Sequence, residues 1–149
     1  MPTRTQLEAD LKDAMRSGDD VRKRTLRMVL SAVKLAEVEK RGELDEAGMI
    51  SVLQREVKAR NETIQDAERA GRPELTEATR AELAVLRAYL PEQLSDDELT
   101  RLARQAIAET GATSPAEMGK VMKALMPKVQ GKVDGKAVSD RVRDLLTPS

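Results

Sequence analysis

Residues 91–99 read Pro-Glu-Gln-Leu-Ser-Asp-Asp-Glu-Leu. This stretch interrupts the helical pattern before it and then carries the signals that begin a new helix. Pro91 disrupts the preceding helical pattern because it has no backbone N–H to donate. Ser95 and Glu98 have the spacing of a capping box, and Leu94 and Leu99 occupy the two positions of a hydrophobic staple. We therefore predict a boundary at residues 91–94, between domains at residues 1–92 and 95–149.

On the N-terminal side of this boundary, apolar residues recur with the period of an α-helix. Gly42 is predicted to end the second helix and Gly71 the third, as glycines after a last basic turn often do. Asn61 falls on the apolar stripe of the third helix, either fixing helix register or acting as an inward-facing functional amide. The four predicted helices run from about Thr5 to Ser17, Asp20 to Arg41, Asp45 to Gly71 and Thr76 to Leu90.

On the C-terminal side, glycine and proline separate three shorter helical patterns. Ser114 and Glu117 predict a second capping box, with Pro115 at the first helical position, where a missing N–H costs nothing. Pro127 is predicted to lie in a basic loop after the second of these helices. No segment alternates with period two. The sequence thus predicts an all-α protein with a four-helix N-terminal unit and a smaller three-helix C-terminal unit.

Composition excludes several kinds of chemistry. The 149 residues include no cysteine and no histidine, so disulfides, Cys/His zinc sites and an imidazole general base are ruled out. No P-loop, nucleophile elbow or metalloprotease motif occurs. We predict no catalytic residues, no metal site and no cofactor. The N-terminus has no apolar leader and no apolar run is long enough for a membrane span, which predicts a cytoplasmic protein without a membrane partner.

Charge is balanced overall, with 26 basic and 26 acidic residues, but residues 115–149 hold 7 basic and 4 acidic ones. Lysines and glycines cluster on one short helix and the loop after it, where lysines could hold phosphates and glycines would allow close approach of an oxyanion. A solvated, lysine-rich turn is the alternative, and Asp134 as an N-cap would compete for the same donors. The candidate residues are Gly119, Lys120, Lys123, Lys128, Gly131, Lys132, Gly135 and Lys136.

A second basic face is predicted on the second helix, where Arg27, Lys34 and Arg41 recur every seven residues. Nearby glutamates would neutralise much of it, so an ordinary solvated helix face is the alternative. Tyr89 is the one aromatic residue, which disfavours base stacking on single strands. Recognition of the backbone or shape of a folded RNA remains open.

Five segments together resemble proteins of the YqeY family, over about residues 5–147. They are Leu26–Glu37, Glu56–Arg60, Ala70–Leu75, Tyr89–Leu94 and Met118–Ala137. Residues 95–149 are also similar to the tail of the B subunit of the tRNA-dependent amidotransferase, which amidates glutamate or aspartate carried on tRNA. The resemblance implies a tRNA-related role, with backbone contacts from Gly119, Lys120, Lys123, Gly131 and Gly135.

The resemblance stops short of the amidotransferase's chemistry, since no segment corresponds to the catalytic domain of the B subunit or to the amidase sequence of its partner. Three hypotheses follow. The first is a non-catalytic accessory protein that binds tRNA or RNA and acts together with an amidotransferase-related complex. No DNA partner is expected. The second is a protein-interaction module whose basic loop meets an acidic partner. The third is a component of a carbon–nitrogen ligase complex with glutamine as amido donor. No oligomeric state is predicted.

Overall fold

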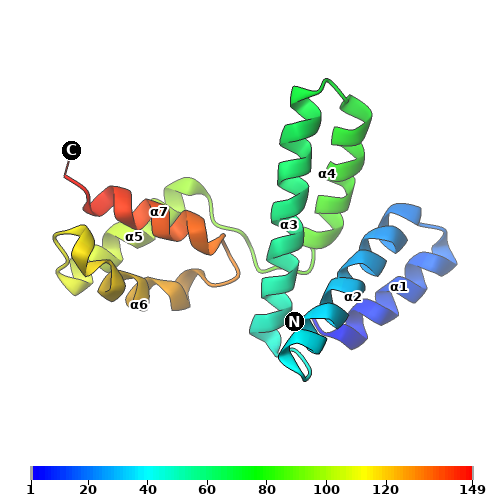
Figure 1. Ribbon diagram of the computed structural model, residues 1–149, viewed down its shortest axis with the longest axis horizontal. Helices are drawn as coiled ribbons and strands as arrows, with labels where there is room; N and C mark the ends of the chain where they lie inside the picture. Colours follow the sequence, from blue (N-terminus) through cyan, green and yellow to red (C-terminus); the bar gives the residue numbers. More distant parts are fainter. Residues whose placement is uncertain (1, 149) are drawn as a thin grey trace. The chain divides into compact units, whose positions relative to one another are not determined.

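The structure, a computed structural model, describes residues 2–148 and is all-α, as predicted (Figure 1). No β-strand occurs among these residues. A short 3₁₀ turn, Pro115–Glu117, precedes α6. The α-helices are α1 Arg4–Ser17, α2 Asp20–Lys40, α3 Glu46–Arg69, α4 Pro73–Arg87, α5 Asp96–Thr110, α6 Met118–Val129 and α7 Gly135–Leu146.

The chain divides into two compact units, Met1–Pro91 with α1 to α4 and Glu92–Ser149 with α5 to α7. Each unit has its own cluster of buried apolar side chains. That the two units are separable domains, able to fold on their own, stays a prediction.

In the first unit, α1 pairs with α2, α3 pairs with α4, and α2 contacts both α3 and α4. The apolar stripes predicted from the sequence supply the core: Leu7 of α1, Leu26 and Val33 of α2, Leu53 of α3 and Leu86 of α4 are almost completely buried. Each stripe faces inward because residues three and four apart lie on one side of a helix.

The bounds of α2 and α4 differ from the prediction. α2 ends with Arg41 in the left-handed conformation (φ +62°), whereas Gly42 was expected to provide the stop. The N–H groups of Arg41 and Gly42 donate to carbonyls of the last turn, so hydrogen bonding holds a non-glycine residue there. α4 begins at Pro73 instead of Thr76, because proline suits a first helical position, and it ends at Arg87 instead of Leu90.

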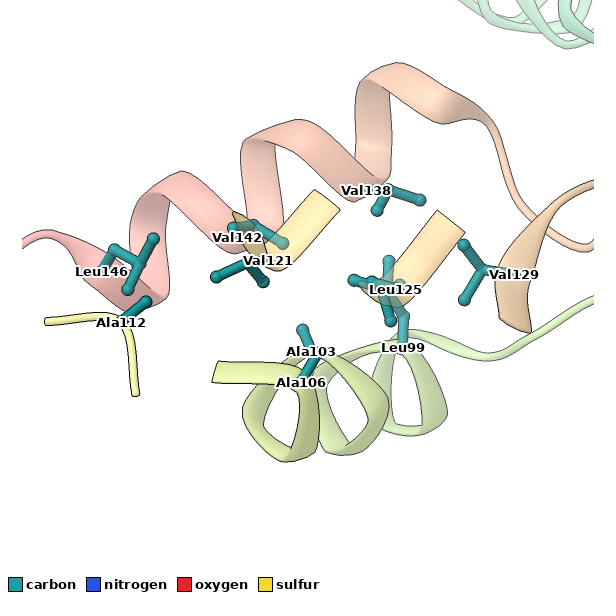
Figure 2. Packing of buried hydrophobic residues seen from close by; sticks show 10 residues of the cluster. All are labelled: Leu99, Ala103, Ala106, Ala112, Val121, Leu125, Val129, Val138, Val142 and Leu146. Atoms are coloured by element: carbon teal, nitrogen blue, oxygen red, sulfur yellow. The ribbon is translucent and has the colours of Figure 1, made fainter. Parts of the chain in front are cut away.

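The core of the second unit is formed by the facing sides of α5, α6 and α7 (Figure 2). Leu99 and Ala103 come from α5, Val121 and Leu125 from α6, and Val142 from α7, and all five are at most 1% exposed. The small alanines of α5 let the larger side chains of the other two helices fill the space between the helices.

The capping box at the start of α5 is confirmed. The Ser95 hydroxyl accepts from the Glu98 N–H at 3.2 Å, and the Glu98 carboxylate accepts from the Ser95 N–H at 3.4 Å. Leu94 packs against the same cluster that contains Leu99, as a hydrophobic staple requires.

Ser95→Ala should lower the free energy of unfolding of the second unit by ~1 kcal/mol, because the first turn of α5 loses an acceptor. Chemical denaturation followed by helical circular dichroism measures this, with Arg104→Ala, at an exposed position of the same helix, as the control. Equal stability of Ser95→Ala and the wild type would show that water replaces the cap at no cost.

The second predicted capping box is wrong. The N–H of Glu117 donates to the Ser114 carbonyl at 3.0 Å, as a 3₁₀ turn requires, and the Ser114 hydroxyl makes no capping bond. The Glu117 carboxylate accepts instead from the N–H of Thr113.

Pro127 lies inside α6, not in the loop where it was predicted. The ring removes one hydrogen bond from the last turn of the helix. Val129 is nevertheless fully buried, four residues after Leu125, and the Gln130 N–H donates to the Met126 carbonyl at 2.9 Å. Burial and this bond keep the turn helical, so Lys128 belongs to α6.

Candidate nucleic-acid interface

The first predicted lysines lie on the solvent side of α6. Gly119, Lys120 and Lys123 are exposed, while Val121 and Leu125 of the same helix point into the core (Figure 2). At 100° per residue the three exposed positions fall within about a third of the helix circumference. Neither lysine forms an ion pair within residues 2–148, so both charges are available to a ligand.

Gly119 has no reason within this fold to be glycine. Its φ is not in the left-handed range, and a Cβ added there would meet no atom within 4 Å. Glycine in an exposed helix costs roughly 1 kcal/mol relative to alanine. A residue without a side chain, beside two lysines that have no acidic partner among residues 2–148, would allow close approach of a ligand to the α6 backbone.

Gly131 has a structural role. It adopts φ +80° and is buried, and its carbonyl accepts from the Gln93 side-chain amide at 3.0 Å. The next carbonyl, of Lys132, accepts from the Leu94 N–H at 2.9 Å. These bonds attach the loop between α6 and α7 to the segment that precedes α5, so Gly131 serves a turn inside the unit.

The remaining candidates lie around the junction of α6 and α7, which are consecutive, packed helices (Figure 1). Lys128 is exposed and its ammonium lies 3.6 Å from Glu109, while Lys132 is half-buried. Lys136 and Gly135 are exposed at the start of α7. Lys136 has no acidic partner among the described residues, so of these three lysines it is the one that is both exposed and without an ion pair.

Asp134 caps α7, as the sequence indicated it could. Its carboxylate accepts from the Lys136 N–H at 3.3 Å. A carboxylate at this position uses one donor of the helix start and repels an incoming anion. The α7 N-terminus is therefore a poorer candidate for an anion site than the α6 face, where no carboxylate caps the helix.

The second basic face lies in the other unit, on α2. Arg27, Lys34 and Arg41 are all exposed, and none has an acidic partner within residues 2–148. Glu37, one of the nearby glutamates that could neutralise this face, pairs instead with Arg4 at 2.8 Å. The two predicted basic sets thus belong to separate units.

No group of three or more Asp or Glu side chains within the described part of the chain could hold a metal ion. No helix between residues 2 and 148 is long and apolar enough to cross a membrane.

Sequence reasoning missed a buried charge network in the first unit. Arg60 of α3 is 5% exposed, and its guanidinium lies 2.8 Å from the Glu56 carboxylate and 3.5 Å from that of Glu82 in α4. Glu82 also lies 3.3 Å from Arg24 of α2. Asn61, predicted to face the core, is exposed. The polar residue of α3 that faces inward is Arg60, which directly precedes Asn61. Its charge network joins α2, α3 and α4.

Tyr89 forms a second missed contact, since its hydroxyl donates to the Asp10 carboxylate of α1. Burial, together with this hydrogen bond, raises the pKa of Tyr89 to about 12. The nearby Arg22 acts in the opposite direction but is outweighed.

The raised pKa predicts a specific alkaline response. The Tyr89 contribution to stability is fully present below pH 10, the ordinary pKa, and is lost as pH rises through about 12. Because Tyr89 is the only tyrosine, tyrosinate absorbance reports it alone. Asp10→Asn should move the midpoint toward 10, and a wild-type midpoint already at 10 in folded protein would contradict the contact.

Comparison with known proteins agrees with the family resemblance of the segments identified in the sequence. The family model described as Yqey-like protein matches residues 4–146. The curated relatives that match are each called altered inheritance of mitochondria protein 41, mitochondrial. The one from Pyrenophora tritici-repentis is 27% identical over 95% of this chain and 79% of its own length. The one from Lachancea thermotolerans is 28% identical over 74% and 60%.

These relatives correct one prediction. Their names place them in mitochondria, which contradicts the cytoplasmic location predicted from the sequence. The match to the family model covers nearly the whole chain, from α1 to the end of α7. The chain therefore belongs to the Yqey-like family.

Proposed function

We propose that the second unit, residues 92–149, binds the sugar–phosphate backbone of a folded RNA of the tRNA type, and that the protein acts as a non-catalytic accessory. The observation that carries the proposal is the exposed face of α6. There Gly119, which the fold does not require, lies beside Lys120 and Lys123, which have no acidic partner. Lysines bind phosphate as point charges, and a bare helix backbone allows close contact.

Two further features support this assignment. The chain offers one aromatic residue, in the first unit, so a ligand recognised by stacking is disfavoured and one recognised by backbone and shape is favoured. Residues 95–149 also resemble the tail of the amidotransferase B subunit, which implies contact with tRNA.

The charge balance sets the expected strength of binding. A chain with zero formal net charge has little long-range attraction for a polyanion, so binding depends on the local lysine face. Affinity should be moderate and should fall steeply with salt.

A filter-binding titration of the full chain tests the proposal, with unmodified tRNA and a DNA duplex of equal phosphate number as competing ligands. We expect preference for tRNA, because the spacing of phosphates along folded RNA differs from that of B-form DNA. Equal binding of both would indicate a general polyanion site. No binding of either would favour the protein-interaction hypothesis.

A further inference from the structure

Helix α2 presents a row of large apolar side chains to solvent. Met28, Leu35 and Val38 are 48%, 61% and 66% exposed, and they are three of the four large apolar residues that lie exposed among residues 2–148. Their spacing of seven and three places them on one side of the helix. The opposite side, with Leu26 and Val33, is already in the core of the unit. The row is about 15 Å long, or nearly three turns.

A groove continues this row toward α3. It has a volume of about 150 Å³ and is lined by Ala32, Leu35, Ala36 and Glu39 of α2 and by Val52, Arg55 and Glu56 of α3. The small side chains of the two alanines leave the space into which a side chain of a partner can insert.

A basic row runs along the other side of the apolar one. Arg27 and Lys34 each precede a member of the apolar row by one residue, and Arg41 continues the same spacing of seven. All three are exposed and lack an acidic partner in the described chain. Arg4 and Arg24 of the same unit differ from them, since they pair with Glu37 and Glu82. The basic row is thus available to a partner.

We propose that this α2 docking surface, formed by Met28, Leu35 and Val38 with Arg27, Lys34 and Arg41, binds an acidic amphipathic helix of a partner protein. A straight row of three apolar side chains beside a groove matches the i, i+3/i+4, i+7 anchors of a helix. The basic row requires glutamate or aspartate along one flank of those anchors, because opposite charges must face each other across the interface.

Charge disfavours a second copy of this chain as the occupant. In a symmetric antiparallel pair the same flank of each helix faces itself, which brings Arg27 opposite Arg41 and Lys34 opposite Lys34. An RNA backbone would satisfy the basic row but would leave the apolar row beside phosphates. An anionic membrane would be met by only three aliphatic side chains and no aromatic residue, a narrow face compared with that of a surface-lying helix.

Selection from a library of single helices tests the proposal with the full chain as bait. Displayed helices of about 18 residues, five turns, carry random residues on one face. We expect enriched sequences to have apolar residues at helical spacing with acidic residues on one flank. Leu35→Ser/Val38→Ser in the bait should abolish their binding, whereas Met15→Ser, at the remaining exposed apolar residue, should leave it unchanged.

The charge requirement has its own readout. Arg27→Gln/Lys34→Gln/Arg41→Gln should weaken a selected helix about tenfold, since each exposed ion pair contributes a few tenths of a kcal/mol to one kcal/mol. Replacing the acidic residues of the helix by glutamine should cause a similar loss, and the two changes together should add little.

Enrichment of neutral or basic helices, or no enrichment at all, would overturn the proposal. So would dimerisation of the free chain that Leu35→Ser/Val38→Ser abolishes, or stronger binding to vesicles of one part phosphatidylglycerol and three parts phosphatidylcholine than to any helix. The inference is independent of RNA binding: Leu35→Ser/Val38→Ser should bind tRNA like the wild type, and loss of tRNA binding in that variant would assign the surface to RNA instead.

Discussion

Arg60→Ala should destabilise the first unit by about 3 kcal/mol, because breaking a buried charge pair leaves charges without compensation. Arg60 is 5% exposed and contacts carboxylates of α3 and α4, so its removal leaves Glu56 and Glu82 facing each other in a partly buried site. The truncated side chain also leaves a cavity beside Met28 of α2, whose sulfur lies 3.6 Å from the guanidinium.

The measurement is chemical denaturation followed by tyrosine fluorescence. Tyr89 is the only aromatic residue and belongs to the first unit, so its signal reports unfolding of that unit without interference from the second. Arg24→Ala is the matched control: Arg24 contacts the same Glu82 but is half exposed, so its loss should cost well under ~1 kcal/mol.

A compensating variant separates lost charge pairing from lost packing. Arg60→Met/Glu56→Leu/Glu82→Leu replaces the whole network by apolar side chains and should recover most of the stability lost in Arg60→Ala. If the triple variant is as unstable as Arg60→Ala, or if Arg60→Ala matches the wild type, the network does not contribute as described.

The same helix shows how far sequence reasoning reaches. The stripe of α3 through Leu53, Val57 and Ile64 was predicted, and residues 60 and 61 both fit a spacing of three or four between its members. Only Asn61 was predicted to lie on the stripe, and arginine is almost never fully buried unless its charge is paired. Arginine is buried here because carboxylates from two helices compensate its charge, and the second of them, Glu82, lies 22 residues further along the chain.

Local signals predicted some of the local structure. The capping box at Ser95 is confirmed, whereas the equally local one predicted at Ser114 is wrong, because a 3₁₀ turn forms there and the Glu117 carboxylate accepts from Thr113. Pro127 was predicted to lie in a loop, but burial of Val129 keeps that turn helical. The exposed lysines of α6 followed from helical periodicity. The role of Gly131 did not, since it depends on Gln93, which lies 38 residues earlier.

Replacing Lys120, Lys123 and Lys136 together by alanine should lower tRNA affinity roughly 100-fold at about 0.1 M salt, because three phosphate contacts release about two counterions or more. The structure selects these three from the lysines predicted by sequence. They are exposed and have no acidic partner in the described chain, while Lys128 lies beside Glu109 and Lys132 is half-buried. The fold should be unaffected, since none of the three faces the core.

The control carries the same change in charge elsewhere. Lys12, Lys40 and Lys58 are exposed in the first unit and, among residues 2–148, also lack an ion pair. Their joint replacement by alanine lowers the net charge equally and should leave tRNA affinity within about twofold, since net charge alone contributes little at physiological salt. Circular dichroism verifies that both variants remain folded.

The most direct test of RNA-backbone binding by the second unit is the slope of log affinity against log salt concentration, measured with tRNA for the wild type, the variant of Lys120, Lys123 and Lys136, and the control variant. We predict a steep negative slope for the wild type and the control. In the variant of Lys120, Lys123 and Lys136 the slope should be less negative by about two, because phosphate contacts are lost. Identical slopes for all three folded proteins would contradict the assignment of the α6 face to RNA.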